Sequence, residues 1–211
     1  MRAGKDIPHY PAARIAEILA PGSIEARLRA HAPSTISRTM APKRAAVAAL
    51  LRFDGASPEL LLMRRATREG DRWSGHVSFP GGGEQASDGD LLATAIREAR
   101  EEVGVDLVRS ARAIGRLDDL MAVAKGKVLP MAITPYVFFQ TGPVELVLGD
   151  EAEATLWLPL GEVLSGALSG TFQYRLGPIP FDLPCWRHAG HVIWGLTHKM
   201  IGQLVEIVSV G

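Results

Sequence analysis

A run of three glycines followed closely by a strongly patterned helix constrains this chain more than any other stretch. Residues 81–83 are all glycine, and they follow the apolar segment 76–80. Residues 90–103 then repeat apolar side chains at helical spacing, with Asp90 at the start and Gly104 directly after the end. These are residue types that commonly begin and end helices. The pattern predicts a strand that runs into a glycine turn, and then a helix that packs one face against a core.

The predicted helix carries Glu98, Glu101 and Glu102 beside its apolar face. Their spacing of i, i+3 and i+4 brings the carboxylates together, and like charges at this spacing destabilise a helix by roughly 0.2–0.5 kcal/mol per pair. An isolated acidic run usually forms a solvated surface. The glycine turn favours another interpretation, because glycine lets the backbone approach a ligand closely and directs N–H groups at an anion. We therefore predict a site for a hard divalent cation, Mg²⁺ or Mn²⁺.

The balance of charge argues against one class of partner. The 211 residues include 23 Lys and Arg and 23 Asp and Glu, whereas a general nucleic-acid binder needs a basic surplus to neutralise phosphates. Cys185 is the only cysteine, so no intrachain disulfide forms, as expected in a reducing compartment. The sequence shows neither a signal-peptide pattern nor an apolar run of membrane-spanning length. We expect a cytoplasmic protein that binds neither nucleic acid nor membrane, and a homodimer is the association to test first.

The texture of the chain changes near residue 43. Residues 1–43 are predicted to form an N-terminal helical extension and linker, with helical patterns at 12–19 and 23–30. Residues 44–211 are predicted to form one α/β domain, because apolar strands alternate with helices. The expected strands cover 45–53, 59–65, 76–80, 112–117, 132–140 and 154–160. The expected helices cover 90–103 and 160–168, and residues 191–208 are expected to begin as a strand and to continue as a helix.

The glycine turn and the acidic helix together resemble the Nudix box, G-x5-E-x7-R-E-U-x-E-E-x-G-U, in which U is an aliphatic residue. The matching residues are Gly83, Arg97, Glu98, Glu101, Glu102, Gly104 and Val105. The resemblance implies a Nudix-type α/β/α sandwich with a mixed β-sheet over residues 44–211. It also implies a pyrophosphohydrolase that uses divalent metal ions to split a small-molecule nucleoside diphosphate linked to another group.

Two positions of the box differ in this chain. The first glutamate falls on Gly89, and the aliphatic position after R-E holds Ala99. The missing glutamate is not one of the family's metal-ligand residues. Asp88 or Asp90 can substitute for the contact that this glutamate usually makes to orient the helix.

The resemblance also implies roles for the acidic helix. Glu98 and Glu102 are the main metal ligands and Glu101 is a further one. Bound metal ions screen the pyrophosphate and lower the pKa of the attacking water. A glutamate of this set, or of a later loop, acts as general base, and Arg97 orients the carboxylates through charge-assisted hydrogen bonds. The predicted catalytic residues are therefore Arg97, Glu98 and Glu101.

The segment before the box looks like the motif L-L-T-x-R-[SA]-x3-R-x3-G-x3-F-P-G-G of coenzyme A pyrophosphatases. The matching residues are Leu61, Leu62, Arg65, Ala66, Gly75, Phe79, Pro80, Gly81 and Gly82. Met63 replaces the threonine, and Arg72 lies one residue too close to Gly75. The motif implies that coenzyme A or an acyl derivative is cut to phosphopantetheine and adenosine 3′,5′-bisphosphate. The predicted substrate-binding residues are Arg65, Arg72, Gly81, Gly82 and Gly83.

Several alternatives stay open. The substrate is otherwise ADP-ribose, a dinucleotide or a nucleotide sugar, or the chain is a non-catalytic binding module of the same fold. An isomerase of this fold acting on isopentenyl diphosphate normally needs a catalytic cysteine, and Cys185 lies far from the box. The two arginines of the motif are equally well explained as solvated side chains, and Glu151 and Glu153 are expected at the surface. Trp157, Trp186 and Trp194 are expected in the core or in the wall of a ligand pocket.

Overall fold

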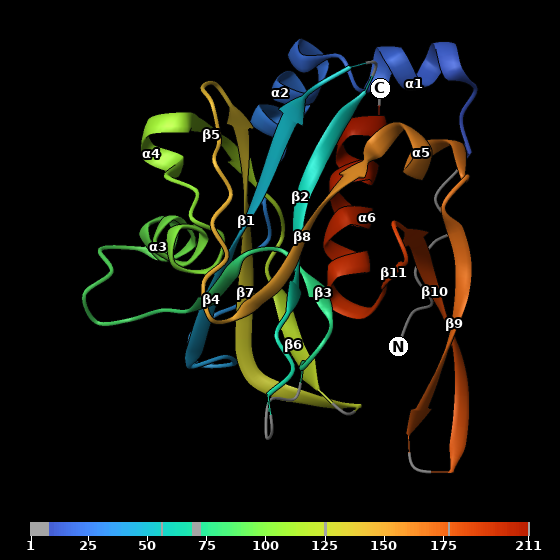
Figure 1. Ribbon diagram of the computed structural model, residues 1–211. Helices are drawn as coiled ribbons and strands as arrows, with labels where there is room; N and C mark the ends of the chain where they lie inside the picture. The colour runs from blue at the N-terminus through green and yellow to red at the C-terminus, as the bar shows by residue number, and fades with distance from the viewer. Residues whose placement is uncertain (1–8, 56, 69–72, 125, 177, 211) are drawn as a thin grey trace.

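The computed structural model describes residues 9–55, 57–68, 73–124, 126–176 and 178–210 (Figure 1). Within these ranges a mixed eight-stranded sheet forms the middle layer of the molecule. Its strands are β1 Lys43–Phe53, β2 Pro58–Arg65, β3 Val77–Ser78, β4 Gly81–Gly83, β5 Ala111–Arg116, β6 Leu120–Ala124, β7 Lys127–Gln140 and β8 Ala152–Pro159. Strands β1 and β7 run parallel, whereas their other neighbours pair with them antiparallel.

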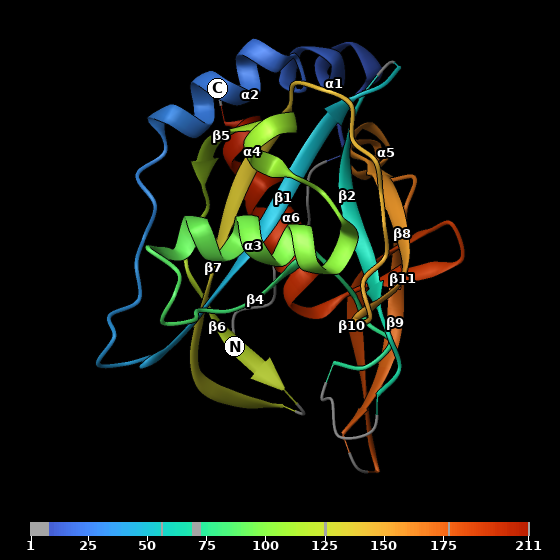
Figure 2. The same ribbon diagram turned by 60° about the vertical axis from the view of Figure 1, so that its left-hand side comes forward.

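Helices cover both faces of this sheet, which confirms the predicted α/β/α sandwich with a mixed sheet. The helices of one face are α3 Leu91–Val103 and α4 Leu107–Ser110. Those of the other face are α1 Ala12–Ile18, α2 Pro21–Ala30, α5 Leu160–Ser165 and α6 Gly195–Ser209. Figure 2 shows α3 crossing in front of the sheet while α6 lies behind it. Over the described residues, no helix is long and apolar enough to cross a membrane.

Strand β1 is buried on both faces, and its side chains alternate between the core beneath α6 and the core beneath α3. On the α3 side, Ala46 and Ala48 share one apolar cluster with Ala95 and Ala99 of the helix. Small side chains on both partners let a helix lie close to a sheet, because no methylene groups separate the two backbones. This close approach determines where the carboxylates of α3 lie.

The first two helices pack into the core beneath α6 through Ile18, Leu19, Ile24 and Leu28. They begin and end near the predicted ranges. The division of the chain at residue 43 into an extension and a domain stays a prediction. The buried apolar residues of α1 and α2 nevertheless belong to the same cluster as residues of β1 and α6.

A second sheet of three strands lies beside α6 (Figure 1), and the sequence patterns predict only one of them, at the start of 191–208. It consists of β9 Ser169–Leu176, β10 Ile179–His188 and β11 His191–Ile193. Pro180 and Pro184 lie on β10, opposite Arg175 and Thr171 of β9. Proline usually marks a turn or an edge strand, so its frequency in this segment obscures the strand pattern.

A buried ion pair fixes the segment before β1. Arg44 donates to Asp119 at 2.7 Å, and the two side chains are 7% and 0% exposed. Arg44 also donates to Ile36 O at 2.7 Å, while the Ile36 N–H and the Thr134 hydroxyl donate to Asp119 at 2.9 Å and 2.6 Å. Burial alone would raise the pKa of Asp119, but these hydrogen bonds and the charge of Arg44 outweigh burial and lower it. The network joins residues 34–36 to strands β1 and β7.

Replacing Asp119 is expected to destabilise the fold strongly. Asp119→Ala leaves the guanidinium of Arg44 buried without its counter-charge, which typically costs about 3–5 kcal/mol of unfolding free energy. Asp118→Ala is the matched control, because Asp118 is one-third exposed and accepts hydrogen bonds from Ser34 N and His31. Its loss should cost about 1 kcal/mol. Urea unfolding of both variants measures the difference. Equal losses of unfolding free energy would show that the buried pair contributes no more to stability than the partly exposed contacts of Asp118.

A partly buried histidine gives the fold a pH dependence of its own. His198 stacks on Trp186 with ring centroids 4.1 Å apart, and burial lowers the pKa of His198 to about 4. In the unfolded chain this histidine is protonated below about pH 6.5, whereas in the folded chain it stays neutral down to about pH 4. The unfolding free energy is therefore highest above pH 6.5 and falls between pH 6.5 and 4.

In His198→Phe, which retains an aromatic ring, this part of the pH slope should be absent. The difference in unfolding free energy between wild type and variant should change by up to about 3 kcal/mol from pH 7 to pH 4. Urea titrations at several pH values give this difference directly. Parallel pH profiles for the two proteins would contradict the assignment.

Candidate active site

Helix α3 forms where the sequence predicts it, because both of its ends are capped. The Asp90 carboxylate accepts a hydrogen bond from Ala93 N at 2.8 Å. Gly104 follows the helix with a left-handed backbone (φ 75°), and its N–H bonds to Ala99 O and Arg100 O. The two caps fix where the helix begins and ends, and thereby which of its acidic residues lie beside strand β4.

The three glycines form strand β4, which pairs with β1, rather than the predicted turn. A Cβ on Gly81 would overlap Ala46 O, and a Cβ on Gly82 would lie 2.5 Å from a carboxylate oxygen of Glu98. Glycine is therefore required here because a strand and a helix side chain approach the same backbone. Substrate binding by Gly81, Gly82 and Gly83 stays a prediction.

Glu102 is the most deeply buried carboxylate of α3, with 2% of its surface exposed. One of its oxygens accepts a hydrogen bond from Gly81 N at 2.7 Å, and the other lies 3.5 Å from the guanidinium of Arg65. Burial raises the pKa of Glu102 to about 7, and the neighbouring charges of Glu98 and Glu151 add to this. The Gly81 N–H and Arg65 oppose the rise without cancelling it. Additional positive charge at this point would stabilise the ionised side chain.

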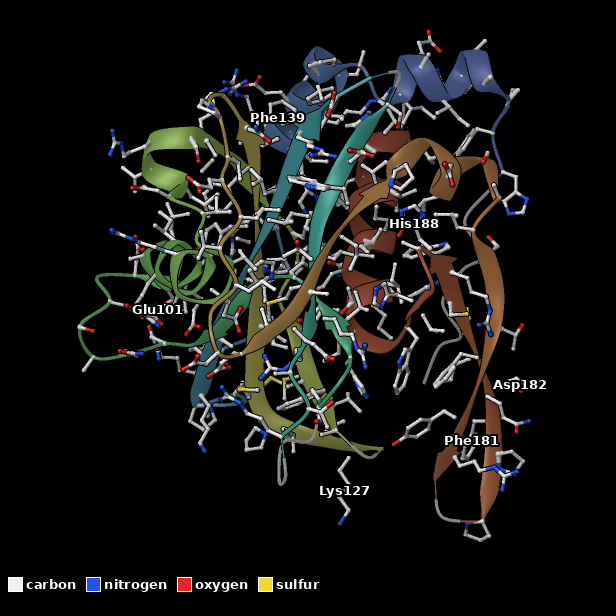
Figure 3. All side chains as sticks on the ribbon, in the orientation of Figure 1. Glu101, Lys127, Phe139, Phe181, Asp182 and His188 are labelled. Atoms are coloured by element: carbon white, nitrogen blue, oxygen red, sulfur yellow. The ribbon has the colours of Figure 1, made fainter. Side chains whose placement is uncertain are left out.

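Arg97 connects the other two glutamates of the helix. Its guanidinium donates to Glu98 at 2.8 Å, to Glu101 at 2.9 Å and to Gly83 O at 3.0 Å. Burial raises the pKa of Glu98, although its bond to Arg97 acts in the opposite direction. Figure 3 shows Glu101 on the acidic side of α3, where it is about half exposed. These contacts place Arg97 where an orienting role is predicted, and that role stays a prediction.

Asp88, one of the two aspartates offered as a substitute for the missing glutamate, contacts Arg97. It accepts two hydrogen bonds from Arg97, at 2.9 Å and 3.0 Å, and one from the Thr94 hydroxyl at 2.9 Å. The Arg97 guanidinium holds the pKa of the Asp88 carboxyl well below its usual range. Asp90 instead caps the helix. Of the two aspartates that the sequence offers, Asp88 therefore orients Arg97.

Arg65 lies between the acidic helix and a second acidic segment. Its guanidinium is 3.5 Å from Glu102 and 3.5 Å from Glu151, which is also 3.5 Å from Arg68. The loop after β7 brings Glu151 here, because Gly149 N donates to Glu102 O at 2.9 Å. Glu151 is thus a surface residue, as predicted, but it borders the site. No sequence pattern joins it to a helix some fifty residues earlier.

The remaining predicted residues lie apart from this cluster or outside the described chain. Glu153 pairs with Arg64 at 3.5 Å on the surface. Arg72 lies outside the described residues. Its predicted role in substrate binding stays a prediction.

The acidic residues fit a hard divalent cation by the type of their donor atoms. All three glutamates offer oxygen, the donor that Mg²⁺ and Mn²⁺ prefer. Two of them, Glu98 and Glu102, have raised pKa values that a nearby cation would lower. Over the described ranges, no three acidic, histidine or cysteine side chains converge to enclose an ion, since Arg97 holds Glu98 and Glu101 and Gly81 holds Glu102. Their assignment as ligands stays a prediction.

Removing the charge of Asp88 should loosen Arg97 and weaken the fold. Asp88→Asn is expected to lower the unfolding free energy by about 1–3 kcal/mol, because two charge-assisted hydrogen bonds in a mostly buried place are lost. Asp90→Asn is the matched control, since asparagine caps helices as well as aspartate does. Urea unfolding compares the two variants. A loss in Asp90→Asn as large as in Asp88→Asn would contradict the assigned contact.

Comparison with known proteins finds one family and several relatives. The NUDIX domain family matches residues 42–175. The chain is 30% identical to the mitochondrial coenzyme A diphosphatase NUDT8 of Homo sapiens, over 90% of this chain and 80% of that protein. It is 32% identical to the uncharacterized Nudix hydrolase NudL of Citrobacter koseri, over 74% of this chain and 78% of that protein.

Two further similarities cover a smaller part of this chain. The chain is 32% identical to the uncharacterized protein C14C4.10c of Schizosaccharomyces pombe, but it spans only 43% of that protein's length. Among solved structures, an Ap4A hydrolase from C. elegans in a binary complex aligns with 58% of this chain and 83% of its own. Its sequence identity is 21% and its TM-score 0.48.

Proposed function

The chain belongs to the Nudix family of pyrophosphohydrolases, and on that premise we propose that it hydrolyses coenzyme A or an acyl derivative with Mg²⁺ or Mn²⁺. The products are phosphopantetheine and adenosine 3′,5′-bisphosphate. We also propose that it acts in the cytoplasm as a homodimer, without nucleic acid or membrane as partner. Divalent metal use is general in the family, whereas the choice of metal belongs to the proposal.

One observation carries the choice of substrate: the segment before the box and the box itself meet at Arg65. This arginine belongs to the pattern typical of coenzyme A pyrophosphatases, and its guanidinium lies 3.5 Å from Glu102. A substrate phosphate near α3 would therefore also be near Arg65. The relative named coenzyme A diphosphatase, which is similar over nine-tenths of this chain, supports the same choice.

The residues of the site support the proposed chemistry in distinct ways. Glu98, Glu101 and Glu102 would hold the divalent ion, which supplies Lewis acidity and an activated water when bound. Arg97 positions Glu98 and Glu101 from one guanidinium, and Asp88 holds that guanidinium. Arg65 places a positive charge beside the site, where it can pair with a phosphate oxygen. Glu101 is about half exposed, so its carboxylate can accept a proton from water.

The alternatives are less well supported by specific contacts. Another nucleoside diphosphate derivative would use the same residues of α3, so only a substrate comparison separates it from coenzyme A. A non-catalytic binding module would have no need of the full acidic set with its orienting arginine. An isomerase using Cys185 is disfavoured, because this thiol is only 2% exposed and lies on β10 of the second sheet.

The test is a substrate panel with Mg²⁺ or Mn²⁺: coenzyme A, acetyl-coenzyme A, ADP-ribose, NADH and diadenosine polyphosphates. Adenosine 3′,5′-bisphosphate should appear from coenzyme A, and Glu102→Gln should lower the rate at least about a hundredfold because a carboxylate of the site is lost. The variant should fold normally, since the amide oxygen still accepts the Gly81 N–H. Products are separated by chromatography.

Glu153→Gln is the matched control, because Glu153 is a surface partner of Arg64 and should leave the rate unchanged. Cleavage of another substrate alone would retain the Nudix chemistry and reject coenzyme A. No cleavage of any substrate by a folded protein would favour the binding module.

A further inference from the structure

Four aromatic side chains from three segments of the chain meet at the edge of the main sheet beside β3. Trp194 is at the centre of this aromatic cluster. Its ring centroid lies 4.8 Å from that of His76, 4.8 Å from that of Phe172 and 5.1 Å from that of Tyr174. His76 directly precedes β3, Phe172 and Tyr174 belong to β9, and Trp194 links β11 to α6. The cluster therefore joins the second sheet to the main sheet.

The cluster is connected to the candidate active site through direct contacts. Arg65, whose guanidinium lies 3.5 Å from Glu102, donates its backbone N–H to His76 O at 2.9 Å. His76 is thus the neighbour of Arg65 across the sheet, and its ring contacts Trp194. Arg65 and the aromatic cluster are therefore neighbours through the pairing of Arg65 with His76.

The rings of the cluster are only partly covered, unlike those of a core. All four are of intermediate exposure, whereas the neighbouring Trp186 is 2% exposed. The same face of the β9–β10 hairpin continues with Phe181, which pairs with Tyr174 and is 44% exposed. Figure 3 shows Phe181 on this hairpin. Large aromatic groups that remain accessible side by side commonly mark a binding surface.

Two charged residues of the hairpin lie on the face away from the aromatic cluster. The pairing of β9 with β10 places Arg175 and Asp182 on the opposite face of the hairpin from Tyr174 and Phe181. Arg187 lies on the face of the cluster, beside Gly170 and Cys185, and donates to Thr171 O at 2.9 Å, while Arg65 and Arg68 lie near Glu102 and Glu151. A neutral planar heterocycle fits these rings, because it can stack on them, and the Tyr174 hydroxyl can bond its polar edge.

From these observations we propose that the aromatic cluster around Trp194 binds the adenine base of the substrate. The proposal rests on the proposed function, which supplies a nucleotide with its phosphates at α3. It assigns His76, Phe172, Tyr174 and Trp194 to substrate selection, whereas cleavage belongs to the residues of α3. The second sheet would thus contribute to substrate binding, which accounts for its position beside β3.

The test measures binding of adenosine 3′,5′-bisphosphate by calorimetry to wild type, Trp194→Leu, Trp194→Phe and Tyr174→Leu. Trp194→Leu should raise the dissociation constant roughly tenfold, because a stacked base is lost, and Trp194→Phe should retain most of the affinity. Binding of phosphopantetheine should not change. Trp157→Leu is the matched control, since Trp157 lies on β8 beneath Arg52 and away from the cluster.

Catalysis gives an independent reading. With any adenine-containing substrate that the wild type cleaves, the variants should raise KM and leave kcat unchanged, which a general loss of structure would not do. Thermal unfolding shows whether each variant is folded. If Trp194→Leu does not fold, Tyr174→Leu tests the proposal in its place.

The proposal would be overturned by unchanged bisphosphate affinity in folded Trp194→Leu and Tyr174→Leu, or by no bisphosphate binding to the wild type. Loss of phosphopantetheine affinity in place of bisphosphate affinity would also overturn it, by assigning the rings to the other half of the substrate. A wild type that binds the bisphosphate but does not cleave coenzyme A rejects the proposed function alone, because the binding comparison among variants still tests the cluster.

Discussion

The close packing of α3 against strands β1 and β4 is the contact on which the rest of the site depends. Alanines of β1 and of α3 share one cluster, and the glycines of β4 leave no Cβ between strand and helix. The helix therefore lies near enough for Glu102 to accept the Gly81 N–H and for Glu98 to face Gly82. The same approach buries Glu102, and burial raises its pKa. The tight packing of the site and the raised pKa of Glu102 thus have one physical cause.

Charge around α3 is distributed unevenly among the carboxylates. Asp88 takes two hydrogen bonds from Arg97, and its pKa is held low. Glu98 shares the same guanidinium, yet burial keeps its pKa raised. Glu102 accepts the neutral Gly81 N–H and has a guanidinium, that of Arg65, only at 3.5 Å. The arginine thus fully satisfies the aspartate that orients it and only partly satisfies the glutamates. A divalent cation, which Nudix hydrolases generally use, would supply the charge that the glutamates lack.

Elements close in sequence could be predicted, and elements that depend on distant partners could not. Residues 90–103 were predictable because the cap, the apolar period and the terminal glycine all lie within one short segment. The helix expected over 160–168 ends early, at Ser165, because Gly166 adopts a left-handed backbone (φ 79°). The prediction of a glycine turn was wrong for a different reason. Residues 81–83 pair as a strand with β1, which lies far earlier in the chain. Proline on β10 obscured the second sheet in the same way, since its pairing with β9 overrides local preference.

The sequence by itself determined the acidic helix, the spacing of its glutamates and arginine, and the family, because each rests on residues a few positions apart. It offered both Asp88 and Asp90 for one contact, and only the fold decided between them, since that depends on which side chain points back to Arg97. The fold alone also brought Glu151 and Arg65 to the helix and the aromatic rings of β9 to His76. Those contacts join segments far apart in the chain, and their meeting depends on which strands pair and on how the two cores pack.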